Sequence, residues 1–326
     1  MRTCSRRCGH DRPPRLPRYP APHLGGTPPG RARGVDRAPG PCVAGRRVVD
    51  VVTAPPFTYF GGKQTLAPRI AALFPPHAHY VEPFAGSLAV LLAKPPSRME
   101  TVNDLDSDLM TFWRVLRDDP TGLERVCALT PHSRGEHQAC YDRPAELSDL
   151  ERARRVWVCL TQGRAGQLKR TGWRHYLDPA GSSIGMPGYL AGYVARMAPA
   201  CERLSRVSLE CRPALELIEA FSPHRDVLLY VDPPYLGSTR TSGGYVHEMR
   251  TESDHRELSE ALSAVRGAVV LSGYLSELYA ELYAGWHRLD ITVGTGQGGT
   301  WESRTEVLWS NRPLGNQRDL FDGVSG

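Results

Sequence analysis

Apolar residues in the first half of the chain gather in two short segments, each followed by a stretch of helical character. Residues 78–82 and 100–104 are rich in apolar and β-branched side chains, which predicts two strands that each end in an acidic residue. Helices are predicted over 86–94, where Leu, Ala and Val precede two prolines, and over 106–117, where Asp and Ser can cap the first turn. This alternation predicts the start of a doubly wound α/β sheet.

The later part of the chain contains its most apolar segment. Residues 226–232 form a nearly continuous apolar run, which predicts a central strand buried on both faces. The further predicted elements are a helix at 255–264, a strand at 268–272, a helix at 275–283, and strands at 286–293 and 305–310. The last two strands predict an antiparallel C-terminal hairpin. Residues 294–299 between them match the G-x-G-x-x-G string of dinucleotide folds but lead into a strand rather than a helix, so we predict a mobile loop there.

Residues 118–212 do not alternate in this way. They hold two helical stretches, 150–160 and 187–204, around a polar, glycine-rich middle, and we interpret the region as a mainly helical subdomain inserted into the sheet domain. The predicted organisation is a disordered tail at 1–54, a catalytic domain at 55–117 and 213–312, the insert at 118–212 and a flexible terminus at 313–326.

Charge is distributed unevenly over these regions. The chain of 326 residues carries a formal net charge of +5, but residues 1–50 alone hold 11 Arg against 3 Asp. Residues 151–212 hold 11 Lys and Arg against 4 Asp and Glu, whereas the rest of the body has a net charge of −10. An acidic scaffold with one basic insert predicts that an anionic partner, such as a nucleic acid, binds at the insert.

The N-terminal tail has the composition of a disordered segment. It holds 9 of the 28 prolines and 7 of the 32 glycines without any helical or strand period. An alternative is that the natural product begins near residues 48–52. The tail lacks the apolar stretch of a secretory signal, no apolar run is long enough to span a membrane, and the eight cysteines are scattered. We therefore expect a cytoplasmic protein, in a bacterial cytosol or a phage-infected host.

Two glycine-containing clusters lie in the first part of the sheet domain. In Tyr59-Phe-Gly-Gly-Lys63, the glycines let the backbone approach a ligand while the lysine ammonium reaches an anionic group. Gln64 replaces the Ser or Thr of a Walker loop, and a polar turn is the alternative interpretation. Residues 82–87, Glu-Pro-Phe-Ala-Gly-Ser, follow the first strand, where doubly wound folds bind nucleotides, although an ordinary βα turn would look similar.

Two acidic clusters end the second strand and the central strand. Asp104 stands 18 residues after Gly86, close to the spacing at which an acidic residue accepts hydrogen bonds from ribose hydroxyls, whereas helix capping explains Asp106. In residues 232–235, Asp-Pro-Pro-Tyr, the prolines stiffen the loop and expose backbone carbonyls, and the tyrosine offers a face for stacking a base. A turn that merely ends the strand is the alternative. The eleven histidines show no metal-ligand spacing, so we predict no metal.

Taken together and in this order, the clusters resemble the DNA adenine methylase (Dam) family of S-adenosylmethionine-dependent DNA methyltransferases. The resemblance covers residues 57–311 and rests on the motifs aromatic-x-Gly-Gly-Lys, Glu-Pro-Phe-x-Gly, Asn-Asp-Leu-x-Ser-Asp-Leu and Asp-Pro-Pro-Tyr. Residues 271–274 and 304–311 are similar to the family's closing strands. The motif order is α-type, and the chain is most similar to the phage and prophage branch. This implies a Rossmann-like methyltransferase sheet and methylation of the exocyclic amino group of adenine in double-stranded DNA.

The resemblance also implies roles for individual residues. Tyr59 and Lys63 would contact the methionine part of S-adenosylmethionine, and Asp104 its ribose. The other implied cofactor-binding positions are Gly62, Glu82, Phe84, Gly86 and Asp232, and the implied catalytic positions are Asp232, Pro233, Pro234 and Tyr235.

The implied chemistry is direct methyl transfer to a base flipped out of the duplex. The Asp232 carboxylate and the Pro233 carbonyl would accept hydrogen bonds from the adenine amino group so that its lone pair can attack, while Tyr235 stacks on the base. No covalent intermediate is needed. The insert would supply DNA contacts from Arg164, Lys169, Arg170, Trp173 and Arg174. We interpret some of Arg152, Arg154 and Arg155 as solvated helix faces.

Residues 161–174 follow the family's recognition segment only loosely, which leaves the target sequence open, and two single positions also depart from the family pattern. Leu88 stands where a second glycine is common, and Thr58 stands where the Dam branch often has lysine. The alternatives are the same fold acting on cytosine N4 or RNA, and a catalytically silent DNA-binding module. Asp232 favours adenine, and the complete Asp-Pro-Pro-Tyr motif disfavours a silent module. We expect a monomer, and the sequence leaves open a restriction endonuclease partner.

Overall fold

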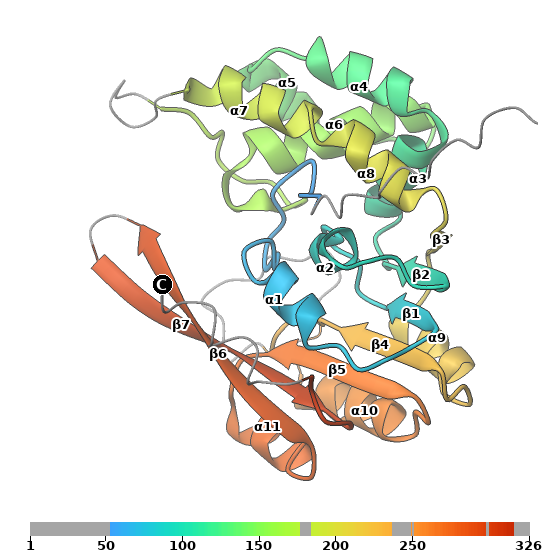
Figure 1. Ribbon diagram of the computed structural model, residues 1–326. Helices are drawn as coiled ribbons and strands as arrows, with labels where there is room; N and C mark the ends of the chain where they lie inside the picture. Colours follow the sequence, from blue (N-terminus) through green and yellow to red (C-terminus); the bar gives the residue numbers. More distant parts are fainter. Residues whose placement is uncertain (1–52, 177–183, 237–248, 250, 298–299, 316–326) are drawn as a thin grey trace, which may run out of the picture. The chain divides into compact units, whose positions relative to one another are not determined.

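Seven strands form one sheet in the computed structural model, which describes residues 53–176, 184–236, 249, 251–297 and 300–315 (Figure 1). The strands are β1 (His79–Glu82), β2 (Met99–Asn103), β3 (Ser208–Glu210), β4 (Val227–Val231), β5 (Ala268–Gly273), β6 (His287–Gln297) and β7 (Thr300–Ser310). Their spatial order is β3-β2-β1-β4-β5-β7-β6. The first five strands of this order run parallel, and β7 lies antiparallel between β5 and β6. The predicted doubly wound sheet with an antiparallel C-terminal hairpin is confirmed.

The direction of strand succession reverses between β1 and β4. The chain proceeds outward from β1 to β2 and β3 on one side, and from β4 to β5 on the other. In open α/β sheets, ligands bind at the carboxyl ends of the strands that flank such a reversal. The topology therefore places a binding crevice beyond Glu82 and Val231.

Helices cover both faces of the sheet because successive strand residues point to opposite sides. Tyr80 and Leu228 belong to one buried cluster, whereas their neighbours Val81 and Leu229 belong to a second. The first cluster is covered by α1 (Ala67–Ala72), α2 (Ala89–Ala93) and α3 (Ser107–Asp118). The second is covered by α9 (Ala214–Phe221), α10 (Glu252–Ser263) and α11 (Glu277–Leu282).

The helix ends follow the capping residues in the sequence. The Asp106 side chain accepts a hydrogen bond from the backbone N–H of Leu109 and begins α3. Thr251 and Asp254 form a reciprocal capping box at the start of α10. Helix α2 ends at Lys94, immediately before two prolines. These local signals explain why the helices after β1 and β2 were predictable to within a few residues.

The inserted region is mainly helical, as predicted. Its helices are α4 (Pro120–Ala128), α5 (Arg134–Ala139), α6 (Asp149–Gln162), the 3₁₀ turn η1 (Arg164–Gly166), α7 (Gly185–Val194) and α8 (Met197–Leu204). Helix α6 packs along α3, and its Trp157 is fully buried in the same cluster as Trp113 of α3. The Trp157 indole N–H donates to the Pro56 carbonyl at 3.0 Å. The insert thus shares a hydrophobic core with one face of the sheet.

The structure differs from the sequence predictions at three points. Residues 208–210 form β3, which pairs with β2, so the sheet resumes before the expected boundary at 213; three residues are too few to show a strand period. The stretch 187–204 contains two helices, since the chain leaves α7 at Ala195. The hairpin pairs as far as Gln297 and Thr300, because glycine keeps both backbone hydrogen-bonding groups. Most of the expected mobile loop is therefore strand, and residues 298–299 lie outside the described part.

Two further expectations concern the ends of the chain. The predicted disorder of the tail falls on residues 1–52, and that of the C-terminus on residues 316–326; both ranges lie outside the described residues. Thr53 is already packed, with its N–H donating to the Leu92 carbonyl at 3.3 Å. Within the described residues, no helix is long and apolar enough to cross a membrane.

Candidate active site

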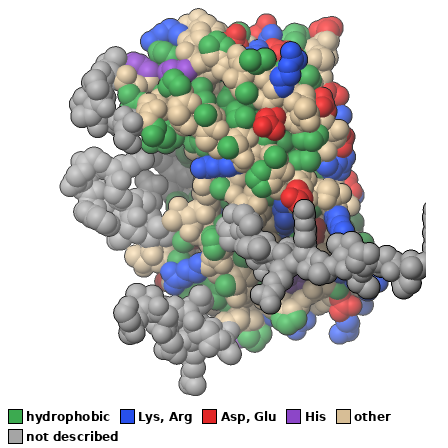
Figure 2. Space-filling view, turned by 45° about the horizontal axis from the view of Figure 1, so that its top comes forward, with side chains coloured by type: hydrophobic (Ala, Val, Ile, Leu, Met, Phe, Trp, Pro, Cys, Tyr) green, Lys and Arg blue, Asp and Glu red, His purple; other side chains and the backbone are tan. Residues whose placement is uncertain are grey.

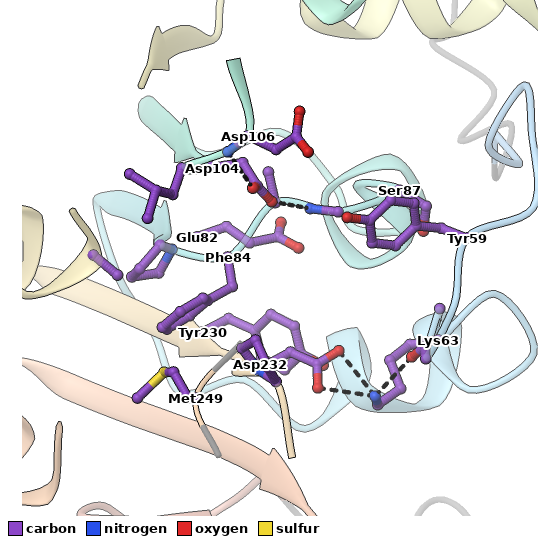
Figure 3. A pocket seen from close by; sticks show the side chains of 18 of the residues that line it. Tyr59, Lys63, Glu82, Phe84, Ser87, Asp104, Asp106, Tyr230, Asp232 and Met249 are labelled. Atoms are coloured by element: carbon purple, nitrogen blue, oxygen red, sulfur yellow. Dashed lines mark hydrogen bonds and ion pairs between the residues drawn. The ribbon is translucent and has the colours of Figure 1, made fainter. Parts of the chain in front are cut away.

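A cavity of about 280 Å³ lies at the carboxyl ends of β1, β2 and β4, where the topology predicts a ligand site (Figure 3). All four sequence clusters contribute to its wall. The lining residues are 59–63, 82–87, 104–106, Asp232 and Pro234, together with Ala89, Val90, 213–215, Tyr230, Met249, Asp254 and Glu257. The structure thus brings together motifs that are up to 169 residues apart in the chain.

The first cluster forms a tight turn before α1. Gly61 has φ +72°, a conformation that favours glycine, and a Cβ on Gly62 would lie 2.9 Å from the Tyr59 carbonyl oxygen. The Gly62 N–H donates to that same carbonyl at 2.9 Å. The paired glycines therefore fold the loop back on itself and direct Lys63 toward the end of β4.

The turn after β1 packs directly against this loop. Gly86 has φ +46°, and a Cβ there would approach the Tyr59 ring to 3.1 Å. The Trp113 indole N–H donates to the Gly86 carbonyl at 3.1 Å and fixes the turn from α3. Glycine at position 86 thus leaves room for the Tyr59 ring. The family resemblance had implied only a cofactor-binding role for Gly86.

Asp104 holds the turns after β1 and β2 together. Its Oδ2 accepts the Gly86 N–H at 3.0 Å, and its Oδ1 accepts the Asp106 N–H at 3.0 Å (Figure 3). Asn103, fully buried, binds the Pro83 carbonyl through Nδ2 at 3.0 Å. A carboxylate oxygen accepts more than one hydrogen bond, so Asp104 keeps acceptor capacity toward the cavity that it lines.

Glu82 is a buried carboxyl group at the end of β1. Its side chain lies on the cavity wall, and Oε2 accepts a hydrogen bond from the Tyr80 hydroxyl at 2.9 Å. Burial raises the pKa of Glu82 to about 8, with the Tyr80 hydrogen bond opposing the shift and Asp232 adding to it. At neutral pH this carboxyl group is therefore mainly protonated.

Asp232 is held by groups from two other parts of the chain and by Tyr235 of its own motif. Lys63 Nζ lies 2.9 Å from both carboxylate oxygens, and the Ser272 hydroxyl of β5 donates to Oδ1 at 2.8 Å. The Tyr235 hydroxyl also approaches Oδ1, at 3.2 Å. Burial opposes the charge on Lys63, but Asp232 and Glu306 outweigh it and raise the pKa of Lys63. Lys63 therefore remains an ammonium group next to Asp232.

Tyr235 is 5% exposed and is not among the residues that line the cavity. Its hydroxyl donates to Glu306 Oε1 at 2.7 Å and is hydrogen-bonded to Lys63, while its ring meets the Tyr274 ring edge-on at 4.6 Å between centroids. The structure places the ring inside a polar cluster rather than in the open position expected of a stacking platform.

Sequence reasoning assigned no role to two residues of this cluster, Ser272 and Glu306. Both occur in segments interpreted only as closing strands, and both contact the Asp232 neighbourhood from β5 and β7. The available signal was a carboxylate in the strand segment Glu306-Val-Leu-Trp309, because a charged group inside an apolar strand is seldom buried without a partner.

The cavity wall is strongly acidic. Among the described residues, its lining contains one basic side chain, Lys63, and six carboxyl groups: Glu82, Asp104, Asp106, Asp232, Asp254 and Glu257. Even with Glu82 protonated, carboxylates outnumber the one ammonium. In a partly desolvated site this imbalance favours a cationic ligand.

The basic residues of α6 are engaged in ion pairs. Arg152 lies 2.7 Å from Asp108, Arg154 lies 2.7 Å from Glu136, and Arg155 lies 2.7 Å from Glu151. All three are less than a quarter exposed, so they are not the solvated helix faces expected for some of them. Figure 2 shows acidic and basic side chains side by side along one margin of the face drawn. The positive charge on α6 is thus largely balanced within the protein.

The predicted DNA-binding residues lie in the loop that follows α6. Its two ends are joined by backbone hydrogen bonds, Arg164 N–H to the Gly172 carbonyl at 3.0 Å and Arg174 N–H to the Gln162 carbonyl at 2.7 Å. Arg164 and Arg170 are exposed and Lys169 is half-buried. The Arg170 guanidinium lies 4.8 Å from the Tyr141 ring centroid.

Trp173, by contrast, is enclosed by other side chains. It stacks with His132 at 4.4 Å and with His175 at 4.9 Å between ring centroids, and the Arg134 guanidinium lies 4.7 Å from its centroid. This arrangement leaves little of the indole for a nucleobase and makes Trp173 a support for the Arg134 guanidinium. Arg174 in turn donates to the Tyr176 hydroxyl at 3.2 Å.

Within the described residues, no group of three or more His, Cys, Asp and Glu side chains is arranged to hold a metal ion.

A doubly wound sheet with an antiparallel seventh strand, and a cavity at its switch point between the Tyr59 loop and Asp232, define a Rossmann-like methyltransferase. A family model described as D12 class N6 adenine-specific DNA methyltransferase matches residues 59–143 and 202–293. The chain belongs to this family. It is an adenine-specific DNA methyltransferase whose methyl donor is S-adenosylmethionine.

A curated relative supports the same assignment. The chain is 27% identical over 276 residues to the type II methyltransferase M1.LlaDCHI of Lactococcus lactis subsp. cremoris, an alignment that covers 78% of this chain and 95% of the relative. The predicted adenine methylation is confirmed, and the alternatives of cytosine, RNA or a silent module are not favoured.

Solved structures show weaker similarity. A precorrin 8w decarboxylase from Methanobacterium thermoautotrophicum aligns with 11% identity and a TM-score of 0.34, covering 79% of this chain and 97% of that one. An rRNA methyltransferase from Streptomyces viridochromogenes aligns with 13% identity and a TM-score of 0.30, covering 81% and 90%.

Proposed function

We propose that the acidic cavity is the S-adenosylmethionine site and that Asp232 orients the adenine amino group there. The observation that carries this proposal is the convergence of the Tyr59 loop, the Glu82–Gly86 turn, Asp104 and Asp232 on one cavity. Its surplus of carboxylates suits a cofactor that bears a positive sulfonium. Tyr59 and Lys63 contact the methionine part, Asp104 the ribose, and Gly62, Glu82, Phe84 and Gly86 form the remaining wall. The cofactor supplies an electrophilic methyl group.

Asp232 acts by accepting a hydrogen bond from the adenine amino group, with the Pro233 carbonyl taking the second. These bonds draw the nitrogen away from conjugation with the ring, so that its lone pair is available. Pro233 and Pro234 keep the loop stiff. Lys63 and Ser272 hold the Asp232 carboxylate in place from two sides, which reduces the reorganisation needed when the base arrives.

The target base is flipped out of the duplex to reach this site, at a cost of a few kcal/mol. In the family-derived role, Tyr235 stacks on the flipped base. Because the Tyr235 ring is buried against Tyr274 and its hydroxyl is bound to Glu306, this role requires the ring to be released from that cluster. We propose that entry of the base is accompanied by this rearrangement.

The insert recognises double-stranded DNA through the loop of residues 163–174. The exposed Arg164 and Arg170 contact phosphates, with Lys169 and Arg174 beside them, and Trp173 positions the Arg134 guanidinium. Arg152, Arg154 and Arg155 take no part, since their charges are paired. We further propose that the enzyme acts as a monomer in the cytoplasm, and that it is paired with a restriction endonuclease, as the type II name of the Lactococcus relative suggests.

Single-molecule sequencing of methylated DNA tests these roles. Unmethylated genomic DNA is incubated with the enzyme and S-adenosylmethionine, and modified positions are then mapped. We expect N6-methyladenine within one short sequence. Alanine substitution of both Arg164 and Arg170 should reduce methylation at that sequence. A folded double variant that keeps full activity would contradict the proposed role of the recognition loop.

A further inference from the structure

Glu306 is a buried carboxylate that stands immediately behind the cavity wall. It is 6% exposed, lies on β7 next to Val307, and pairs opposite Ile291 of β6. Its Oε1 accepts a hydrogen bond from the Tyr235 hydroxyl at 2.7 Å and lies 3.6 Å from Lys63 Nζ. No part of Glu306 lines the cavity. Its influence on a ligand therefore passes through Lys63 and Tyr235.

Lys63 is shared between two carboxylates. Its ammonium is 2.9 Å from Asp232 and 3.6 Å from Glu306, so these three groups together carry a net charge of −1 when both carboxyl groups are ionised. Burial and the neighbouring Asp232 raise the pKa of Glu306, whereas the Lys63 ammonium and the Tyr235 hydroxyl oppose that shift and stabilise its ionised form. A buried charge without a full counter-ion is unfavourable, and a cation brought next to the cluster relieves that cost.

We propose that Glu306 makes the site selective for cationic ligands, so that the positively charged methyl donor binds more tightly than its neutral demethylated product. This inference rests on the proposed function of the cavity. Transfer of the methyl group breaks the carbon–sulfur bond and leaves the bonding electrons on sulfur, which turns the sulfonium into a neutral thioether. The adenine nitrogen gains the methyl group and loses one proton, which passes to solvent water. A surplus negative charge thus favours substrate binding and product release.

Within the cluster of Lys63, Asp232 and Glu306, the surplus of negative charge depends on Glu306 because Asp232 alone would be balanced by Lys63. Replacing Glu306 by glutamine keeps an oxygen that can accept the Tyr235 hydrogen bond and removes only the charge. The cluster then becomes neutral, and a cation loses the part of its advantage over a neutral ligand of the same shape that this cluster supplies. A purely structural role for Glu306 predicts instead that all ligands weaken together.

Calorimetric titration without DNA measures this preference independently of turnover. The ligands are S-adenosylmethionine, S-adenosylhomocysteine, which lacks the methyl group and its charge, and sinefungin, whose amine carries a positive charge near the sulfonium position. For Glu306→Gln we expect Kd to rise at least fivefold for the two cations and less than twofold for S-adenosylhomocysteine. Glu281→Gln, which removes an exposed carboxylate in α11, is the matched control and should leave all three Kd values unchanged.

Thermal unfolding of both variants verifies that they are folded. An unchanged ratio of cation to neutral affinity in folded Glu306→Gln overturns the charge selectivity, whether the individual affinities fall together or stay constant. Wild-type protein that binds none of the three ligands contradicts the proposed function as well. Should Glu306→Gln not fold, Glu306→Asp, which keeps the charge, must retain the wild-type ratio, and a lost ratio in that variant overturns the proposal.

Discussion

The ammonium of Lys63 lies 2.9 Å from the carboxylate of Asp232, although 169 residues separate them in the chain. Lys63 belongs to the turn before α1, and Asp232 follows β4 after the whole insert has intervened. Lys63 is buried, and the nearby carboxylate of Asp232 offsets part of the cost of burying its charge. The site is therefore complete only when both halves of the sheet have assembled around the insert.

Glu82 should make stability depend on pH. Its pKa is raised by burial to about 8 from an ordinary value of 4.5, so the folded protein holds a proton that the unfolded chain has lost. The stabilisation is fully present below about pH 4.5 and is lost as pH rises to about 8, with a slope of about 1.4 kcal/mol per pH unit. Glu82→Gln should flatten this part of the profile, measured by urea unfolding at several pH values. Identical profiles for wild type and variant would show that Glu82 is ionised in the folded protein.

Gly166 should be intolerant of a side chain. It has φ +59°, and a Cβ would lie 2.8 Å from the Thr58 carbonyl oxygen, while its own carbonyl accepts the Phe60 N–H at 2.8 Å. This contact joins the recognition loop to the loop that carries Tyr59 and Lys63. We expect Gly166→Ala to lower the free energy of unfolding by about 1–3 kcal/mol.

Gly192 provides the matched control for this substitution. It lies within α7, and a Cβ there meets no atom within 4 Å, so Gly192→Ala should be neutral or stabilising by up to about 1 kcal/mol. Chemical denaturation of the two variants measures the difference. Equal effects would mean that the tight backbone contact at Gly166 does not constrain the fold.

Arginines on α6 and in the following loop should differ in their effect on DNA binding. The logarithm of the DNA-binding constant falls linearly with the logarithm of the salt concentration, and removing one phosphate contact makes this slope less steep by about 0.9. We expect this change for Arg164→Ala and for Arg170→Ala. Arg154→Ala should leave the slope unchanged and reduce stability, because Arg154 is paired with Glu136 and Glu151. Fluorescence anisotropy with a DNA duplex at several salt concentrations separates the two classes, and equal slopes for all three variants would exclude this division.

Deletion of residues 1–50 should leave methylation at the specific sequence intact. The Thr53 N–H donates to the Leu92 carbonyl and the Trp157 indole donates to the Pro56 carbonyl, and the truncation removes neither contact. Loss of the tail's 11 arginines should weaken at most the salt-sensitive, non-specific affinity. A folded truncated protein without activity would refute this expectation.

The parts of the fold that the sequence predicted are those with strong local signals. The run at 226–232 is apolar enough to predict a strand, and Asp106 caps α3 as expected. The strand β3 was missed because its three residues lie at the sheet edge and show no period. Spacing alone would have revealed the pairing of Glu151 with Arg154 and Arg155, since residues three and four apart meet on a helix.

Within the site, the motifs predicted which residues gather but not how they are engaged. Tyr235 was expected to present an open face, and the structure shows it buried against Tyr274 with its hydroxyl on Glu306. That arrangement depends on β7, which reaches the site only through the order of strands in the sheet. Contacts between residues so far apart in sequence carry no local signal, and only the assembled fold reveals them.

The most direct test of this account is nucleoside analysis of DNA methylated by wild-type enzyme and by Asp232→Asn. The variant keeps the shape of the side chain but loses the charge that Lys63 and Ser272 hold in position. We predict N6-methyladenine with the wild type, and a rate reduced by about 10²–10³-fold with the folded variant. Equal amounts of N6-methyladenine from both proteins would contradict the assignment of methyl transfer to this site.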